Sequence, residues 1–327
     1  MREQEKGMVY KMKDYFERPE CIKEAAQNQK GLPLALEILV FVGIFIMASL
    51  AELVFILPGE MYLMYTNSDF VEAAAAGNQD AIAEISAQIS SSNAYSVMGL
   101  FANLGLILVV WFSCKIFQRR KMSSLGFCKK DAWKEYVRGA LAGLVAFSAA
   151  VGICMLTGAV KFEGISETFS IGIFLAFVAG FLIQGMAEEM LCRGYFMVSV
   201  ARKSTMLVAI LTNSLVFACL HLLNTGISVL AFINLTLYGI FASVYFIKRG
   251  NIWAPAAFHS IWNLVQGNVY GIYVSGTTNN CKLLESVSVE GKTLWNGGAF
   301  GLEGGLAVTI ILVVGILFLC TRKAKRQ

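Results

Sequence analysis

The chain has 327 residues, of which 57% are hydrophobic and only 15% charged, and its mean hydropathy is +0.63. These values exclude an ordinary soluble domain and are typical of a polytopic membrane protein. The net charge of +5 is small and gives no indication of a nucleic-acid partner. We therefore expect an all-α protein, a transmembrane helix bundle of about eight spans in a lipid bilayer.

The N-terminal part is predicted to hold a polar segment and one span. Residues 1–30 are mixed in charge, which indicates a cytoplasmic segment, either a helix along the membrane surface or a solvated tail. The first span covers about residues 31–57 and is closed by Pro58. Its carboxylates, Glu37 and Glu52, lie near its ends, where they can snorkel to the interface, so neither needs a catalytic role.

Two contrasting connections flank the second span. Residues 59–95 contain no Lys or Arg and are helix-prone over 71–88, which indicates an extracytoplasmic loop with a short helix. The second span, about residues 96–114, leads into a basic connector over about residues 115–138. Apolar residues recur there at helical spacing among the lysines, so we expect an interfacial amphipathic helix on anionic lipid.

Six further apolar runs complete the predicted bundle. They cover about residues 139–160, 171–200, 205–223, 227–247, 252–274 and 304–320. Gly139 and Gly143 give the third span a small-residue face for close helix packing. The stretch over residues 275–303 is rich in Gly, Asn and Ser and is predicted to be an external loop.

The charge distribution predicts the orientation in the membrane. Eight spans place both termini on one side, and all but three of the 27 Lys and Arg residues fall on that side. The exceptions are Lys161, Lys282 and Lys292. By the positive-inside bias we expect a multi-pass integral membrane protein with both termini cytoplasmic.

Ionisable residues stand inside the fourth span. Glu188, Glu189 and Arg193 lie in an apolar run, where charges usually line a cavity or a functional site because each costs several kcal/mol in hydrocarbon. On a helix, Glu189 and Arg193 share a face and can pair, whereas Glu188 is turned about 100° away from Glu189. One carboxylate is then tied up, and the other is free for chemistry.

Both histidines of the chain belong to the same pattern of intramembrane polar residues. Phe217 and His221 lie four residues apart in the fifth span, and His259 and Asn263 lie four apart in the seventh, so each pair shares a helix face. Singly, such residues are more often packing or hydrogen-bonding groups. Together with Glu188 they can activate water, since a carboxylate and an imidazole can share its proton. A second imidazole and an amide can donate to a developing oxyanion.

The motifs EExxxR, FxxxH and HxxxN, in this order on separate helices, resemble those of the CPBP family of intramembrane proteases. This family includes the type II CAAX prenyl endopeptidases and bacterial homologues tied to bacteriocin processing and immunity. Cys192 stands where the family often has Phe. The resemblance divides the chain into residues 1–136 with two spans and the basic helix, a catalytic core over 137–275, and residues 276–327 with an external loop, the last span and a basic tail.

The resemblance implies an intramembrane endopeptidase that hydrolyses a peptide bond in a membrane-associated peptide or protein. Its substrate would be a CAAX-type prenylated C terminus, a peptide leader or a membrane-protein segment. Glu188 and His221 would polarise the attacking water, and His259 and Asn263 would hold the oxyanion. The residues that would give structural support are Glu189, Arg193 and Phe217.

The sequence leaves the metal requirement open. Members of the family are commonly called metalloproteases, and Glu188, His221 and His259 could form a three-ligand zinc site with an open position. However, the chain has no HExxH motif, and a zinc site would leave Asn263 without an obvious task. We favour a metal-free, glutamate-dependent mechanism without a cofactor.

The rise of a helix per residue predicts different depths in the bilayer for three of the candidate catalytic residues. At about 1.5 Å per residue, Glu188 and His221 lie more than ~20 Å from the cytoplasmic ends of their spans, whereas His259 lies only ~12 Å from the start of its own. A tilted fourth helix, or a cytoplasmic end that projects from the membrane, would bring Glu188, His221 and His259 to the same depth. We expect the cavity in the cytoplasmic half to the middle of the bilayer.

Two other classes of function fit part of the pattern. A proton-coupled transporter also uses intramembrane Glu, His and Arg, but the chain has no inverted repeat and its polar groups concentrate in one half. A non-catalytic immunity or scaffold protein could keep the fold, but the complete motif set argues against lost activity.

Overall fold

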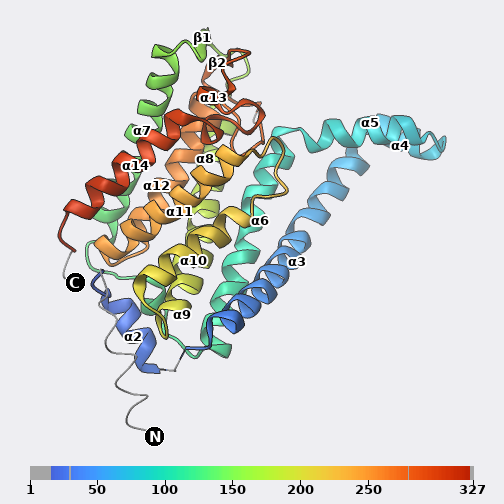
Figure 1. Ribbon diagram of the computed structural model, residues 1–327. Coiled ribbons are helices and arrows are strands. Elements are labelled where there is room, and N and C mark those ends of the chain that lie inside the picture. Colours follow the sequence, from blue (N-terminus) through green and yellow to red (C-terminus); the bar gives the residue numbers. More distant parts are fainter. Residues whose placement is uncertain (1–15, 29–30, 279, 325–327) are drawn as a thin grey trace, which may run out of the picture.

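The computed structural model describes residues 16–28, 31–278 and 280–324, and within them eight apolar helical segments pack side by side (Figure 1). The segments are α3 (Leu34–Thr66), α6 continuing into the π-helix η1 (Asn93–Phe112, Ser113–Phe117), α7 (Ala132–Leu156), α8 continuing through the π-helix η3 into α9 (Ile171–Glu189, Met190–Met197, Val198–Ala201), α10 (Met206–Cys219), α11 (Val229–Arg249), α12 continuing into the π-helix η4 (Trp253–Leu264, Val265–Val269) and α14 (Leu306–Thr321). The predicted all-α bundle is confirmed, and each segment overlaps a predicted span, although several begin or end elsewhere.

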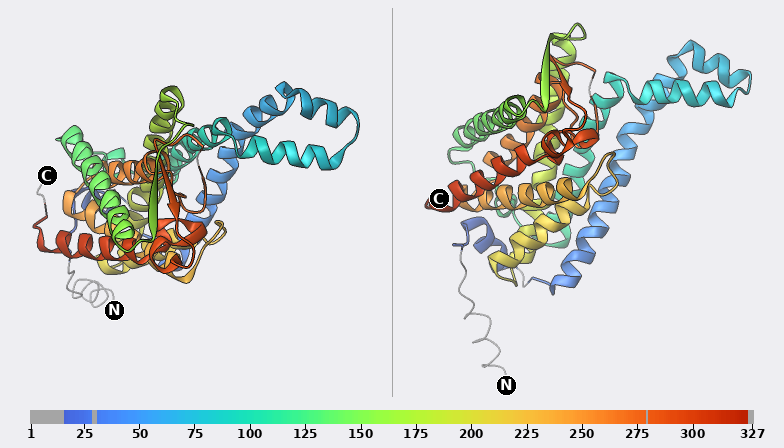
Figure 2. Two further views of the ribbon diagram at one scale, coloured as in Figure 1. Left: turned by 90° about the horizontal axis from the view of Figure 1, so that it is seen from above. Right: turned by 45° about the horizontal axis from the view of Figure 1, so that its top comes forward.

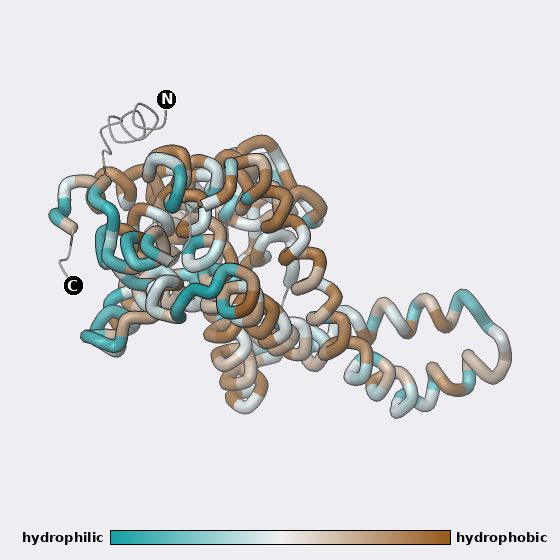
Figure 3. Tube along the Cα trace, turned by 90° about the horizontal axis from the view of Figure 1, so that it is seen from below, coloured by the Kyte–Doolittle hydropathy of each residue, from teal (hydrophilic) through white to brown (hydrophobic). Residues whose placement is uncertain are grey.

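Five of these segments are long and apolar enough to cross a membrane: α3, α6 with η1, α7, α8 through α9, and α11. Two others, α10 and α14, are shorter apolar helices. Large apolar side chains point outward from the bundle, such as Val54, which is 70% exposed, and Val145, which is 66% exposed. Figure 3 shows the same division, with apolar residues along the helices and hydrophilic residues in many of the connections. Lipid is the solvent that suits such a surface.

Small residues hold α12 at the centre of the bundle. A Cβ atom at Gly139 or Gly143 of α7 would lie 2.1 Å from the carbonyl oxygen of Ala254 or 2.6 Å from that of Phe258, so only glycine permits this contact. On the other side of α12, a Cβ at Gly185 of α8 would lie 2.4 Å from Ser260 Oγ. The predicted small-residue face of the third span is therefore confirmed, and it sets the position of α12.

The first span differs from the prediction. α3 does not end at Pro58 but continues through it to Thr66, so Glu52 lies well inside the helix. Glu37 does not snorkel: it is 1% exposed and accepts a hydrogen bond from Arg202 Nη2 at 3.1 Å. A proline removes one backbone donor, but the chain is helical on both sides of Pro58.

The connection after α3 forms two helices where one was predicted. α4 (Ser68–Ala75) and α5 (Gln79–Ser90) are joined by a turn at Gly77, whose φ is +67°. Figures 1 and 2 show this pair projecting as an arm from one end of the bundle. We call this end of the bundle the α5 end.

Two segments close the opposite end of the bundle: α2 (Glu20–Asn28), which precedes the first span, and the connector that follows the second span. α2 buries Cys21, Ile22 and Ala25 against the bundle, and the rest of the predicted cytoplasmic segment, residues 1–15, lies outside the described residues. The last turn of α14 lies at this end too, since Lys248 Nζ donates to the carbonyl oxygen of Arg322 at 2.7 Å. We call it the α2 end.

The predicted interfacial helix over residues 115–138 is wrong. The chain there forms a short 3-10 helix, η2 (Met122–Leu125), and turns into the bundle, and α7 begins only at Ala132. Arg120 is 3% exposed because its guanidinium donates to backbone oxygens of Ser124 and Gly194 at 3.0 and 3.1 Å. A buried, fully engaged arginine is a tertiary feature that charge spacing does not reveal.

A small two-stranded sheet lies at the α5 end, where only loops were predicted. β1 (Val160–Ile165) pairs antiparallel with β2 (Leu284–Ser288), with an irregularity between Phe162 and Gly164 (Figure 2). The elements that follow before α14 are α13 (Thr293–Asn296), η5 (Gly298–Phe300) and η6 (Leu302–Gly304). This sheet ties the connection before α8 to the loop before α14.

Candidate active site

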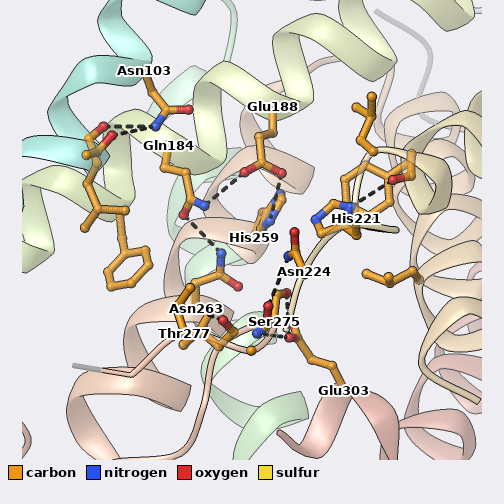
Figure 4. A pocket seen from close by; sticks show the side chains of 18 of the residues that line it. Asn103, Gln184, Glu188, His221, Asn224, His259, Asn263, Ser275, Thr277 and Glu303 are labelled. Carbon is orange, nitrogen blue, oxygen red and sulfur yellow. Dashed lines mark hydrogen bonds and ion pairs between the residues drawn. The ribbon is translucent and has the colours of Figure 1, made fainter. Parts of the chain in front are cut away.

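The bundle encloses a cavity of about 650 Å³. All four residues expected to be catalytic line it: Glu188 from α8, His221 from the end of α10, and His259 and Asn263 from α12 (Figure 4). The remaining lining comes from these same helices, from α3, α6, η3, α11 and α14, and from loops at the α5 end. The structure therefore brings the three sequence motifs to one place.

The two adjacent carboxylates have different surroundings. Glu189 is fully buried, and its Oε1 accepts from Arg193 Nη1 at 2.9 Å and from His259 Nδ1 at 3.0 Å. The Glu188 side chain is 21% exposed and accepts from Gln184 Nε2 at 2.9 Å. Glu189 is thus the paired carboxylate and Glu188 the accessible one, as helix geometry predicts.

A change of helix type follows the carboxylates directly. α8 ends at Glu189, and the next eight residues, Met190–Met197, form the π-helix η3 with Arg193 inside it. π-Helical turns are costly and are found most often at functional sites. Here the wider turn still lets Arg193 reach back to Glu189, and it aims the guanidinium at the faces of Phe217 and Tyr238, at 4.6 and 5.6 Å from the ring centres.

His259 is held between the two glutamates. Its Nδ1 bonds to the buried Glu189, so Nδ1 carries a hydrogen, because an ionised carboxylate can only accept. Its Nε2 lies 3.8 Å from Glu188 Oε2. The imidazole in contact with Glu188 is therefore that of His259, whereas the sequence paired Glu188 with His221. Tyr238, which the motifs do not include, packs edge-on against the His259 ring at 5.1 Å.

His221 is fixed by the end of its own helix. α10 ends at Cys219, and the last carbonyls of a helix have no partner within the helix. The carbonyl oxygen of Phe217 accepts from His221 Nδ1 at 2.9 Å. This bond leaves Nε2 as the acceptor atom, and Figure 4 shows the ring directed into the cavity. Phe217 packs on His221 at 4.8 Å between ring centres, as the motif suggested.

Gln184 joins Asn263 to Glu188. Asn263 Nδ2 donates to Gln184 Oε1 at 3.1 Å, and Gln184 in turn donates to Glu188 (Figure 4). Sequence reasoning missed Gln184, although a signal was present: it stands four residues before Glu188 in an apolar run, on the same helix face. The chain of amides orients the Glu188 carboxylate and leaves one N–H of Asn263 free for another acceptor.

The start of α12 answers the question of depth. Ile252 N donates to Gly126 O at 3.0 Å, and a Cβ at Gly194 would lie 3.4 Å from Ile252 Cδ1, so α12 begins level with Gly194 rather than at the α2 end. Glu188 precedes Gly194 by six residues, ~9 Å, and His259 follows Ile252 by seven, ~10 Å. The two catalytic candidates therefore share one level because α9 and the start of α10 project beyond α12.

Loops contribute to the cavity lining at the α5 end of the bundle, and the predicted depth, in the cytoplasmic half to the middle of the bilayer, stays a prediction. The lining reaches Ser91 at the end of α5, Asn224 after α10, and Ser275 and Glu303 in the loop before α14. Asn224 donates to the carbonyl oxygen of Ser275 at 3.0 Å, and both Ser275 N and Oγ donate to Glu303 (Figure 4). The cavity therefore extends to the α5 end, and this loop cluster forms its rim.

The residues present do not assemble a zinc site. Within the described part of the chain, no group of three or more His, Cys, Asp or Glu side chains converges closely enough to hold a metal ion. Nδ1 of His259 contacts Glu189 and Nδ1 of His221 contacts the carbonyl oxygen of Phe217, so only the two Nε2 atoms could bind a metal. Glu188, His221 and His259 are therefore not such a group, whereas zinc needs its ligands within bonding distance of one point.

The fold and the cavity define a polytopic helical membrane protein with a polar site buried inside its bundle. Residues 170–265 match the family model of the Rce1-like type II CAAX prenyl endopeptidases. This segment is therefore similar to the CPBP family of intramembrane proteases, as its motifs indicated, and the apolar helices make the chain an integral membrane protein. The matched segment spans α8 to α12 and contains all three motifs. No match was found among curated proteins or among solved structures.

Proposed function

We propose that the chain is an intramembrane endopeptidase that hydrolyses a peptide bond of a membrane-associated substrate inside the cavity. The observation that carries the proposal is the meeting of an accessible carboxylate, two imidazoles and an amide around one cavity within an Rce1-like domain. The name of the matched family points to a prenylated C terminus as one substrate class, and a peptide leader is another.

Glu188 and His221 activate the attacking water in this proposal. Glu188 keeps Oε2 free of amide partners, and His221 presents Nε2 as an acceptor, so both can take part in removing a proton from one water molecule. The hydroxide adds to the substrate carbonyl carbon, the C–N bond breaks, and the proton passes to the leaving amine. The two groups come from different helices, which places the water between α8 and the end of α10.

His259 and Asn263 stabilise the oxyanion. Because Nδ1 of His259 donates to Glu189, Nε2 can donate only when the ring is an imidazolium. Glu188 and Glu189 flank the ring and favour that charged form. Asn263 offers its second amide N–H. Two donors aimed at a developing oxyanion are typical of acyl-transfer sites.

We place both termini in the cytoplasm. Among the described residues, the Lys and Arg side chains lie in or beside the connections at the α2 end, except Arg193 inside the bundle and Lys161, Lys282 and Lys292 at the α5 end. With this orientation the α5 end of the bundle faces away from the cytoplasm.

Cleavage by the purified protein tests the proposal. In detergent, the wild-type chain is expected to cleave a membrane-anchored fluorogenic peptide, and Glu188→Gln is expected to lose at least about 100-fold in kcat, since general catalysis contributes 10²–10⁴-fold. The matched control is Glu60→Gln, a carboxylate of α3 outside the cavity lining. Equal cleavage by Glu188→Gln and the wild type would refute the assignment.

A further inference from the structure

The two ends of the bundle differ in how many residues they contribute to the cavity lining. At the α5 end, loop residues such as Ser91, Asn224 and Thr278 line the cavity directly. At the α2 end, none of the lining residues within the described part of the chain belongs to α2 or to the connector over residues 118–131. Loops therefore contribute to the cavity lining at the α5 end, whereas the described segments that close the α2 end contribute nothing to it.

The α2 end is sealed by buried polar contacts. Arg120 donates to Gln118 Oε1 at 2.8 Å and to Ser199 Oγ at 3.2 Å, besides its backbone partners in η2 and η3. Burial lowers the pKa of Arg120 to about 10, so the guanidinium stays charged at neutral pH. Leu125 is fully buried beside it, and Arg18 Nη1 of the segment before α2 donates to Ala201 O at 2.9 Å. Opening this end would break these buried hydrogen bonds to a charged group, each worth about 1.5–3 kcal/mol.

The charge of the cavity lining adds a second constraint. Glu52, Glu188 and Glu303 line the cavity, and no Lys or Arg is among the described residues that line it. Glu303 already accepts from Ser275, and Glu188 from Gln184. Glu52 is half-buried in α3, and its backbone is fixed by Gly105 of α6, whose added Cβ would lie 3.1 Å from Glu52 N.

A free C-terminal carboxylate fits this lining poorly. The last three residues of a CAAX-type substrate would carry their carboxylate into the cavity, close to the scissile bond. It would meet three glutamates against a single cation, the His259 imidazolium, which Glu188 and Glu189 already flank, and like charges in a low-dielectric interior repel strongly. A neutral internal segment, or one with a positive charge beside Glu52, meets no such penalty.

On the basis of the proposed function, we propose that the substrate is an exported polypeptide that enters the cavity from the extracytoplasmic side and presents an internal segment. Both constraints lead to it: loops line the cavity at the α5 end, and the lining carries more carboxylates than cations. A cytoplasmic protein with a prenylated C terminus satisfies neither.

The side of entry can be measured without a substrate. Ser49 lines the cavity from the middle of α3, and Ser49→Cys is a conservative change there. In intact cells, a small membrane-impermeant cationic methanethiosulfonate is expected to modify Ser49→Cys as it modifies Gln88→Cys, an exposed position on α5. Lys121→Cys, whose side chain is 76% exposed at the α2 end, is expected to react only after permeabilisation. Mass spectrometry of the modified peptides separates these positions from the native cysteines.

Each outcome of the labelling experiment is decisive. If Gln88→Cys reacts only after permeabilisation, the orientation is reversed and the inference falls. If Gln88→Cys reacts in intact cells but Ser49→Cys does not, the cavity is closed from that side and the inference falls too. Labelling does not depend on catalysis, so it stands even if the protein cleaves nothing.

The charge constraint is measured with two peptides in detergent. They share a sequence with the scissile bond three residues from the C terminus, and they differ only in a free or amidated terminus. We expect the amide to be cleaved with a kcat/KM about tenfold higher, a difference of 1.4 kcal/mol. In Glu52→Gln this preference is expected to shrink, with Glu60→Gln unchanged as control. Preference for the free acid would overturn the inference, whereas cleavage of neither peptide would instead refute the proposed function.

Discussion

The buried pair of Glu189 and Arg193 gives the sharpest test of the roles within the site. Glu189→Gln keeps the size of the side chain but removes its charge. Arg193 then keeps a hydrogen bond of 3.5 Å to Gly239 O and the faces of two aromatic rings, but it has lost its anion in a fully buried position. Breaking one side of a buried pair typically costs about 3–5 kcal/mol.

The neighbours of Arg193 allow a closer estimate of the free energy of unfolding that Glu189→Gln loses. The rings of Phe217 and Tyr238 retain about 1 kcal/mol of cation–π attraction, so we expect a loss of about 3 kcal/mol, at the low end of that range. For a chain of this size, that corresponds to a midpoint of thermal unfolding lower by roughly 6 °C. The assay is thermal unfolding of the purified protein in detergent, followed by tryptophan fluorescence.

Two further variants complete the test. Glu189→Gln with Arg193→Gln leaves neither charge stranded, so the double variant should be more stable than either single one. Glu188→Gln changes the accessible carboxylate and should unfold at the wild-type temperature. The reasoning is refuted if Glu189→Gln is as stable as the wild type, or if the double variant is less stable than both single ones.

Four other predictions follow from the site and the packing. His221→Ala should leave the midpoint of thermal unfolding unchanged and abolish cleavage, and a folded variant with wild-type kcat would exclude His221 from the reaction. Chelation with EDTA should leave cleavage intact, whereas stoichiometric zinc in the purified protein, lost together with activity, would contradict a metal-free mechanism. Gly143→Leu should sharply lower membrane yield because its side chain would collide with Phe258 O, while Gly152→Leu, with nothing within 4 Å of an added Cβ, should not; equal yields would contradict the packing. Reporter fusions at about residues 75 and 285 should report the extracytoplasmic side, and a cytoplasmic signal at 75 would overturn the orientation.

The helices and the motif positions could be predicted from the sequence because both depend on local spacing. Apolar runs located every long helix, and spacing of four residues placed Glu189 with Arg193 and Phe217 with His221. The distinction between a paired Glu189 and an accessible Glu188 followed from the same periodicity.

Contacts between distant segments could not be predicted. The sequence did not indicate that His259 would bond to Glu189, since this contact depends on how deep α12 starts, and that depth is set by Gly126 and Gly194. The basic connector was predicted as a lipid-bound helix because nothing local shows that Arg120 finds backbone acceptors inside the bundle. The position of the cavity mouth likewise depends on loops from four separate parts of the chain.

The deep start of α12 bears on how the protein is made. α12 has 12 residues and η4 only 5 more, and both ends of this segment are buried against other helices. Such a segment is a poor independent span, since about 20 apolar residues are needed to cross the hydrocarbon core. We therefore expect α12 to insert by packing between α7 and α8, which precede it in the chain. A nascent chain that has inserted α8 and α10 carries Glu188 and His221 but still lacks His259 and Asn263. Under the proposed function, a half-made copy therefore lacks both residues of the oxyanion site until α12 has packed against α7 and α8.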